Sequence, residues 1–188
     1  MKKPDYQIDN EDAWLIGARV VPSPNCDARP ENTEIDLLVI HGISLPPKEY
    51  GGGYIDQLFT NTLVPEVHPY FAEIHELRVS PHVLIDREGR VTQYVPFTKR
   101  AWHAGDSSFN GRYQCNDFSI GIELEGCDDE AYCDIQYTTL AMMTELICQH
   151  WNKITKDRIV GHSDIAPGRK TDPGPAFDKN YYISLLTL

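Results

Sequence analysis

Two histidines and one aspartate, far apart in the sequence, are of the residue types that bind a metal ion. They are His41, His162 and Asp172. Each histidine ends a short apolar run typical of a buried strand, and strand ends in open α/β sheets border the crevice where ligands bind. A histidine so placed is still more often a hydrogen-bonded structural residue than a ligand. Spacing alone therefore leaves both interpretations open and favours the structural one.

The segment GHSDIAPGRKTDPGPAF, residues 161–177, favours the metal site, because it combines a histidine, aspartates and a lysine in a stretch stiffened by prolines. It closely resembles the zinc-ligand signature of the N-acetylmuramoyl-L-alanine amidases, a family that includes phage lysozyme amidases and peptidoglycan recognition proteins. Four further blocks resemble this family in the same order: LLVIHGISLPP (37–47), HVLIDREGRVTQYVP (82–96), AWHAG (101–105) and FSIGIELEG (118–126). The chain is most similar to the short cytoplasmic branch, which acts on anhydro-muropeptides.

The resemblance implies one Zn²⁺ per chain, bound by His41, His162 and Asp172, with Glu123 and Lys170 as the catalytic pair. It also implies an enzyme that hydrolyses the amide bond between the lactyl group of (1,6-anhydro-)N-acetylmuramic acid and L-alanine during peptidoglycan recycling. Three protein ligands leave zinc a fourth position for water, whose pKa the ion lowers towards about 7.

Several roles depend on the resemblance rather than on charge pattern. Glu123 and Glu125 share one face of a predicted strand, and only the family position selects Glu123 as the proton carrier. Lys170 would place a positive charge on the oxyanion, although most lysines beside an arginine are simply solvated. Asp164 either orients a ligand histidine or caps a turn, and both readings stay open. Gly42 departs from the polar residue expected after the first ligand, which puts substrate contacts there in question.

A muropeptide carries carboxylates and a rigid sugar, so its binding site is expected to use arginines and aromatic faces. The predicted substrate-binding residues are Tyr70, Arg78, Trp102, His103 and Arg112, with His103 the histidine expected to line the cleft.

Residue patterns predict the elements that must position these groups. We expect strands over 35–41, 119–126 and 158–162, and a hairpin over 79–95 that turns at 86–89. Helices are expected near 54–61, over 134–153 and from Pro175 onward. The polar, glycine-punctuated stretch 105–118 predicts a long exposed loop of the kind that can lie over a site. The predicted fold class is α/β, with a mixed central β-sheet flanked by α-helices in a single domain over 1–188, its core at about 20–178.

Charge and cysteine content limit the partners and the location. The formal charge of −11 and sequence pI near 5.0 argue against nucleic acid or an anionic membrane as the main partner. The N-terminal twenty residues lack the apolar run of an export signal, and five cysteines without metal-finger spacing suit a reducing compartment. A cytoplasmic monomer acting on a small muropeptide is the expectation. A non-catalytic muropeptide-binding module and an exported amidase acting on intact peptidoglycan are the alternatives.

Overall fold

The centre of the structure is a pair of long parallel strands, β5 (Leu37–Ile43) and β11 (Ser119–Glu125). They belong to a six-stranded sheet with the order β12-β5-β11-β6-β7-β3, whose other strands are β12 (Ile159–Gly161), β6 (Val83–Ile85), β7 (Val91–Gln93) and β3 (Arg19–Val20). The β6–β7 hairpin is antiparallel and every other pair is parallel, so the predicted mixed sheet and hairpin are confirmed. This computed structural model describes residues 6–188; residues 1–5, part of the segment predicted to lack an export signal, lie outside the described residues.

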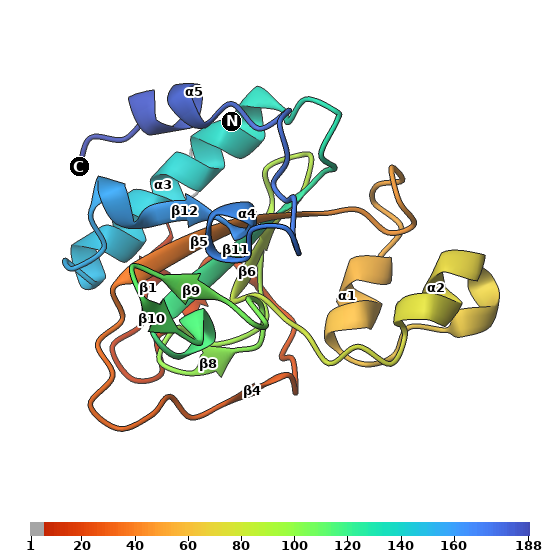
Figure 1. Ribbon diagram of the computed structural model, residues 1–188, viewed down its shortest axis with the longest axis horizontal. Coiled ribbons are helices and arrows are strands. Elements are labelled where there is room, and N and C mark those ends of the chain that lie inside the picture. The colour runs from red at the N-terminus through yellow and green to blue at the C-terminus, as the bar shows by residue number, and fades with distance from the viewer. Residues whose placement is uncertain (1–5) are drawn as a thin grey trace.

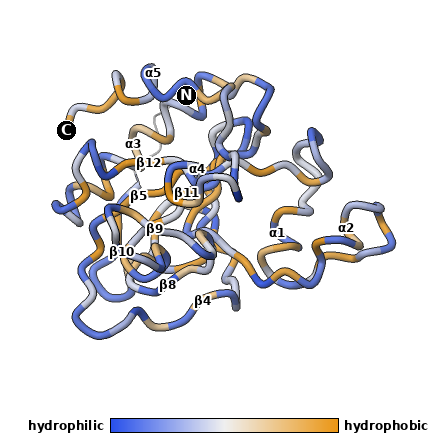
Figure 2. Tube along the Cα trace, in the orientation of Figure 1, coloured by the Kyte–Doolittle hydropathy of each residue, from blue (hydrophilic) through white to orange (hydrophobic). Residues whose placement is uncertain are grey.

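Alternation along the two central strands divides the sheet into two buried faces. One face, with Leu38, Ile40, Ile120 and Ile122, packs against helix α3 (Asp134–His150). The other contains Leu37 and Val39 and is covered by the 104–118 segment. The polar side chains of β11 lie on this second face: Ser119 and Glu125 are buried, whereas Glu123 is partly exposed and lines a cleft. The apolar core and its covers can be followed along the trace in Figure 2.

Two short helices, α1 (Tyr54–Phe59) and α2 (Pro69–Ile74), form an arm beside the sheet (Figure 1). The chain enters the arm after β5 and returns through residues 75–82 into β6. The arm has its own apolar cluster, which includes Leu58, Phe59 and Phe71, and this cluster also holds Leu84 of β6. The arm therefore packs as a distinct layer next to the carboxyl end of β5.

The segment predicted as a long loop, 105–118, is more ordered than expected. It contains a small hairpin, β9 (Ser108–Phe109) with β10 (Arg112–Tyr113), and a 3-10 turn at Cys115–Asp117. Asn110 and Gly111 connect the strands with positive φ angles of 49° and 78°, the backbone of the tight hairpin turn that an Asn-Gly pair favours. That dipeptide was the overlooked signal.

The remaining elements differ from expectation mainly at their ends. The long helix α3 stops at His150, and the last helix, α5 (Lys179–Ser184), begins after Asp178, whose carboxylate accepts a hydrogen bond from the Tyr181 N–H and so caps the helix. No helix within residues 6–188 is long and apolar enough to span a membrane. The other short elements are β1 (Gln7–Ile8), β2 (Leu15–Ile16), β4 (Cys26–Asp27), β8 (Arg100–Ala101), α4 (His162–Ile165) and the 3-10 turns Pro65–Val67 and Lys156–Arg158.

The guanidinium of Arg29 ties the 114–119 segment to the sheet. It donates hydrogen bonds to the backbone carbonyls of Asn116, Asp117, Phe97 and Ser119, at distances of 2.8–3.1 Å. Burial lowers the pKa of Arg29 to about 10, and the group stays charged at neutral pH. One side chain thus satisfies four carbonyls that converge behind the start of β11.

We expect Arg29→Lys to lower the free energy of unfolding by about 2–4 kcal/mol, because a single ammonium cannot reach the carbonyls that the planar guanidinium satisfies. Urea denaturation measures the change. Arg90→Lys is the matched control, since the Arg90 side chain is 68% exposed and its replacement should change stability by less than about 0.5 kcal/mol. Equal losses in the two variants would contradict the role given to Arg29.

Candidate metal centre and active-site cleft

The register of the parallel strands brings the predicted metal ligands together. In the β5–β11 pair His41 lies opposite Glu123, and in the β12–β5 pair Gly161 lies opposite Ile40, so that His162 follows directly beside His41. Parallel strands present their carboxyl ends at one edge of a sheet, and the ligands of open α/β folds bind at this edge. Asp172 comes from the loop after α4, and the Ser163 N–H, which donates to the Asp172 carbonyl, fixes this loop against the helix.

The three predicted ligands offer one atom each to a common point. His41 Nδ1 lies 3.0 Å from His162 Nδ1 and 3.2 Å from Asp172 Oδ2, and the third side of the triangle, from His162 Nδ1 to Asp172 Oδ2, is 3.1 Å. Ligand distances of about 2.0–2.2 Å at tetrahedral angles require donor atoms about 3.3–3.5 Å apart, so the triangle is close to the size that zinc needs. Two imidazoles and one carboxylate are also the donor types of catalytic zinc sites.

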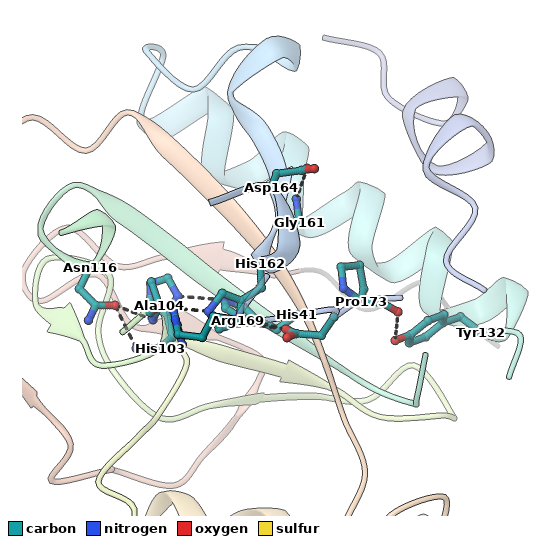
Figure 3. A network of polar contacts seen from close by, with 11 residues as sticks. His41, His103, Ala104, Asn116, Tyr132, Gly161, His162, Asp164, Arg169 and Pro173 are labelled. Atoms are coloured by element: carbon teal, nitrogen blue, oxygen red, sulfur yellow. Dashed lines mark hydrogen bonds and ion pairs between the residues drawn. The ribbon is translucent and has the colours of Figure 1, made fainter. Parts of the chain in front are cut away.

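Both ligand histidines are buried and are held at their far nitrogen as well. His41 Nε2 lies 2.9 Å from His103 Nδ1, and His162 Nε2 lies 3.0 Å from the carbonyl oxygen of Ala104 (Figure 3). Burial lowers the pKa of His41 to about 4, although the neighbouring Asp172 carboxylate opposes the shift. His41 is therefore neutral at physiological pH, as a metal ligand must be.

Glu123 lies next to this centre, and one of its carboxylate oxygens, Oε2, is buried without a hydrogen-bond partner. Burial raises the pKa of Glu123 well above its ordinary value, the nearby Asp172 carboxylate adds to the shift, and Lys170 opposes it. A carboxyl group whose pKa is raised in this way holds a proton more readily than an ordinary glutamate, which suits it to general acid–base chemistry. Glu125, the alternative on the same strand, instead accepts hydrogen bonds from the backbone N–H groups of Gly51 and Arg87.

A cleft of about 670 Å³ opens over the centre. The three predicted ligands and Glu123 line its floor, the exposed Lys170 lies at its rim, and the α1–α2 arm forms an apolar wall. The arm contributes Leu58, Phe59, Tyr70, Ile74 and Leu77. The cleft thus places a polar surface, which holds the predicted metal ligands, against an apolar one, and small-molecule sites commonly combine apolar walls with a few polar groups.

Two of the five residues predicted to bind substrate, Tyr70 and His103, line the cleft, and three lie outside its lining. Arg78 is exposed and its guanidinium lies against the carbonyls of His75 and Leu77. The Trp102 side chain hydrogen-bonds Asp27, whose pKa is lowered chiefly by Arg100, with Trp102 adding to the shift against the effect of burial. Arg112 pairs with Asp36 and stacks on Phe118. The lining of the cleft includes no residue of the 105–118 segment, the loop considered from the sequence as a cover for the site.

Two open questions from the sequence have structural answers. Asp164 caps a turn, because its carboxylate accepts a hydrogen bond from the Gly161 N–H at 2.8 Å (Figure 3). The same carboxylate pairs with Lys179. Gly42 is needed where it stands: a Cβ atom at this position would lie 2.3 Å from the hydroxyl oxygen of Tyr132, which donates to the Pro173 carbonyl.

The residues that the sequence did not reveal support the site by hydrogen-bonding the backbone of His103 and Ala104. Asn116 accepts backbone hydrogen bonds from His103 and Ala104, and Arg169 donates to the Ala104 carbonyl. Arg169 lies within the 161–177 motif but was given no role there, and no motif marks Asn116. Gly121, in the middle of a buried strand, was a readable signal, since such a glycine often marks a place where another group comes close.

Taken together, the fold and this centre are those of a metal-dependent hydrolase. The family model for N-acetylmuramoyl-L-alanine amidase matches residues 31–175. The chain therefore belongs to the N-acetylmuramoyl-L-alanine amidase family, as its sequence motifs predicted.

Close relatives lie within one branch of this family. The chain is 60% identical to the 1,6-anhydro-N-acetylmuramyl-L-alanine amidase AmpD of Escherichia coli K12, over 89% of this chain and 91% of the relative. It is 56% identical to AmpD of Haemophilus influenzae, over 94% and 96% of the two chains. Among solved structures, a selenomethionine AmpD crystal structure superposes with a TM-score of 0.91 at 56% identity, covering 94% of this chain and 98% of the other.

Replacing Glu123 by Gln should stabilise the metal-free protein at neutral and alkaline pH. The folded-state pKa of Glu123 is raised above that of the unfolded chain, about 4.3, so its stabilising contribution is complete below that pH and is lost as pH rises. Glutamine does not titrate. In the presence of a chelator we expect the melting temperature of Glu123→Gln to exceed that of the wild type by a few degrees at pH 8 and to converge with it near pH 4. Glu88→Gln, an exposed carboxylate, should show no such trend.

Gly42→Ala should destabilise the protein by about 1–3 kcal/mol through the overlap with the Tyr132 hydroxyl. Tyr132→Phe removes the overlapping atom and leaves the nearest ring carbon 3.5 Å away, an ordinary contact. The double variant should therefore be more stable than the sum of the two single losses predicts, as a double-mutant cycle of unfolding free energies would show. Strict additivity would mean that the hydroxyl is not what excludes a side chain at position 42.

Proposed function

We propose that the protein hydrolyses the amide bond between the lactyl group of 1,6-anhydro-N-acetylmuramic acid and the L-alanine of a stem peptide, in peptidoglycan recycling, with one zinc ion per chain as cofactor. The observation that carries the proposal is the triangle of His41, His162 and Asp172 beside an unpaired Glu123 carboxylate. The AmpD relatives named above supply the substrate class. A solved complex of the amidase AmiD from Escherichia coli contains anhydro-N-acetylmuramic acid-L-Ala-D-γ-Glu-L-Lys, and it shares the fold with a TM-score of 0.59 at 26% identity.

Zinc bound at this site would activate water and polarise the scissile carbonyl. Side chains of the protein would transfer the proton and stabilise the developing negative charge. Glu123, with its raised pKa, takes the proton of the attacking water and delivers it to the leaving amine of L-alanine. Lys170, at the rim of the same cleft, places its ammonium against the negative charge that develops on the carbonyl oxygen.

The cleft has the surfaces that the substrate requires. Tyr70 and the apolar side chains of the α1–α2 arm offer a wall for the sugar and the lactyl methyl group, opposite the polar floor. His103 lies behind His41 rather than at the mouth of the cleft, so its role concerns the ligand more than the substrate. We also propose that the protein acts as a cytoplasmic monomer; the five free thiols are in keeping with a reducing compartment.

The test is mass spectrometry of the products from an anhydro-muropeptide and from the normal muramyl peptide, with zinc content measured on the same samples. We expect release of the free peptide and the sugar, and a fall in kcat of about 10²–10⁴-fold in Glu123→Gln with zinc retained. Asp172→Ala should lose both zinc and activity, and Glu88→Gln should match the wild type. Metal-loaded protein that leaves both substrates intact, and an Asp172→Ala variant that still binds them, would instead support the binding module.

A further inference from the structure

The side chain of His103 connects a predicted metal ligand to the interior of the protein. It is 8% exposed, its Nδ1 faces His41 Nε2 at 2.9 Å, and its Nε2 faces the hydroxyl of Ser119 at 3.1 Å. The ring lies against β11 at Gly121, where a Cβ atom would come within 2.5 Å of the His103 Nδ1. The glycine in the middle of this buried strand therefore provides the space for the imidazole.

His41, His103, Ser119 and the Cys115 carbonyl form a row of hydrogen bonds, and the carbonyl fixes the direction of each of them. The Ser119 hydroxyl lies 2.5 Å from the carbonyl oxygen of Cys115, which can only accept, so the hydroxyl donates there. Its oxygen is then left to accept from His103 Nε2–H. His103 Nδ1 in turn carries no proton and accepts from His41 Nε2–H, which leaves the Nδ1 lone pair of His41 directed towards Asp172 and His162.

The next residue acts on the second ligand histidine. The Ala104 carbonyl accepts from His162 Nε2–H at 3.0 Å, so His162 also carries its proton on Nε2 and keeps its Nδ1 lone pair. The two backbone N–H groups of His103 and Ala104 both donate to the Asn116 side-chain oxygen, at 3.0 and 2.7 Å, which locks the dipeptide in place (Figure 3).

We propose that the His103–Ala104 dipeptide, anchored by Asn116 and Ser119, is a single positioning element that sets the tautomer and orientation of both zinc-ligand histidines. This inference rests on the proposed zinc site. Residues outside the ligand set thus direct the Nδ1 lone pairs of His41 and His162 towards the metal site. His103 is a positioning residue rather than a substrate contact.

The experiment measures zinc affinity by competition with a chelator in the full-length protein. His103→Leu fills the space without an acceptor, and we expect zinc to bind about 10–100-fold more weakly, the usual effect of losing such a partner. His103→Asn restores an acceptor near the Nδ1 position and should recover part of that loss. An affinity of His103→Leu within twofold of the wild type would overturn the proposal.

A second variant keeps the test valid if His103→Leu fails to fold. Ser119→Ala leaves the ligands and His103 in place but removes the group that fixes the His103 tautomer, and we expect a severalfold loss of zinc affinity. Ser23→Ala is the matched control, because Ser23 is also a buried serine whose hydroxyl donates to a carbonyl at 2.5 Å, that of Phe59, and it has no hydrogen bond to a metal ligand or to His103. Equal zinc affinities of the two serine variants would count against the proposal.

Cobalt substitution gives a readout that general stability does not affect. Because the visible absorption of Co²⁺ reports ligand geometry, the spectrum of His103→Leu should differ from that of the wild type, whereas the spectrum of Ser23→Ala should not. These measurements do not use muropeptide. Wild-type protein that binds zinc but cleaves no substrate would therefore refute the proposed reaction and leave this inference testable, whereas unchanged affinities in a fully active enzyme would refute the inference alone.

Discussion

The parallel pairing of β5 with β11 and β12 is the constraint on which the site depends. The register sets His41 opposite Glu123 and brings the chain to His162 beside them. A shift of one residue in either pairing would turn the affected side chain to the opposite face of the sheet, into the apolar layer beneath α3. The same alternation that sends Leu38, Ile40, Ile120 and Ile122 into that layer sends the functional side chains to the cleft. The hydrophobic pattern that folds the sheet thus also specifies the active-site geometry.

This arrangement works against the stability of the metal-free protein. Three electron-pair donors converge within 3.2 Å of one another, and an unpaired carboxylate oxygen lies buried beside them. Each would be better solvated in the unfolded chain. The rest of the fold holds them there: Arg29 fixes the segment before β11, Asn116 within that segment fixes His103 and Ala104, and these two residues contact the ligand histidines. Binding of a cation relieves the convergence of the donors, so metal affinity and folding are coupled.

Much of the fold could be predicted from the sequence because its main elements are strongly patterned. The strand predicted over 35–41, the 79–95 hairpin and the long helix are defined by local periodicity, and the resemblance of the 37–47 and 161–177 segments to the family predicted the metal ligands. The Asn110–Gly111 pair was also a local signal, for the tight turn between β9 and β10, but the sequence analysis did not use it. Positions such as Asn116 and Ser119 could not be predicted, since their roles depend on carbonyls and N–H groups that only the fold brings near. Arg78, Trp102 and Arg112 were chosen for their chemical type, and type alone does not say which way a side chain faces.

The apolar wall of the cleft comes from one continuous stretch of chain, the arm between β5 and β6, while the floor with the predicted metal ligands comes from strand ends and loops scattered across the rest of the sequence. Chemistry and recognition are therefore encoded separately. A relative could acquire a longer, shorter or differently shaped arm in a single insertion or deletion and so accept a free fragment, a branched peptide or a polymer strand, while the hydrolytic machinery stayed unchanged. In this architecture the choice of substrate can diversify faster than the reaction.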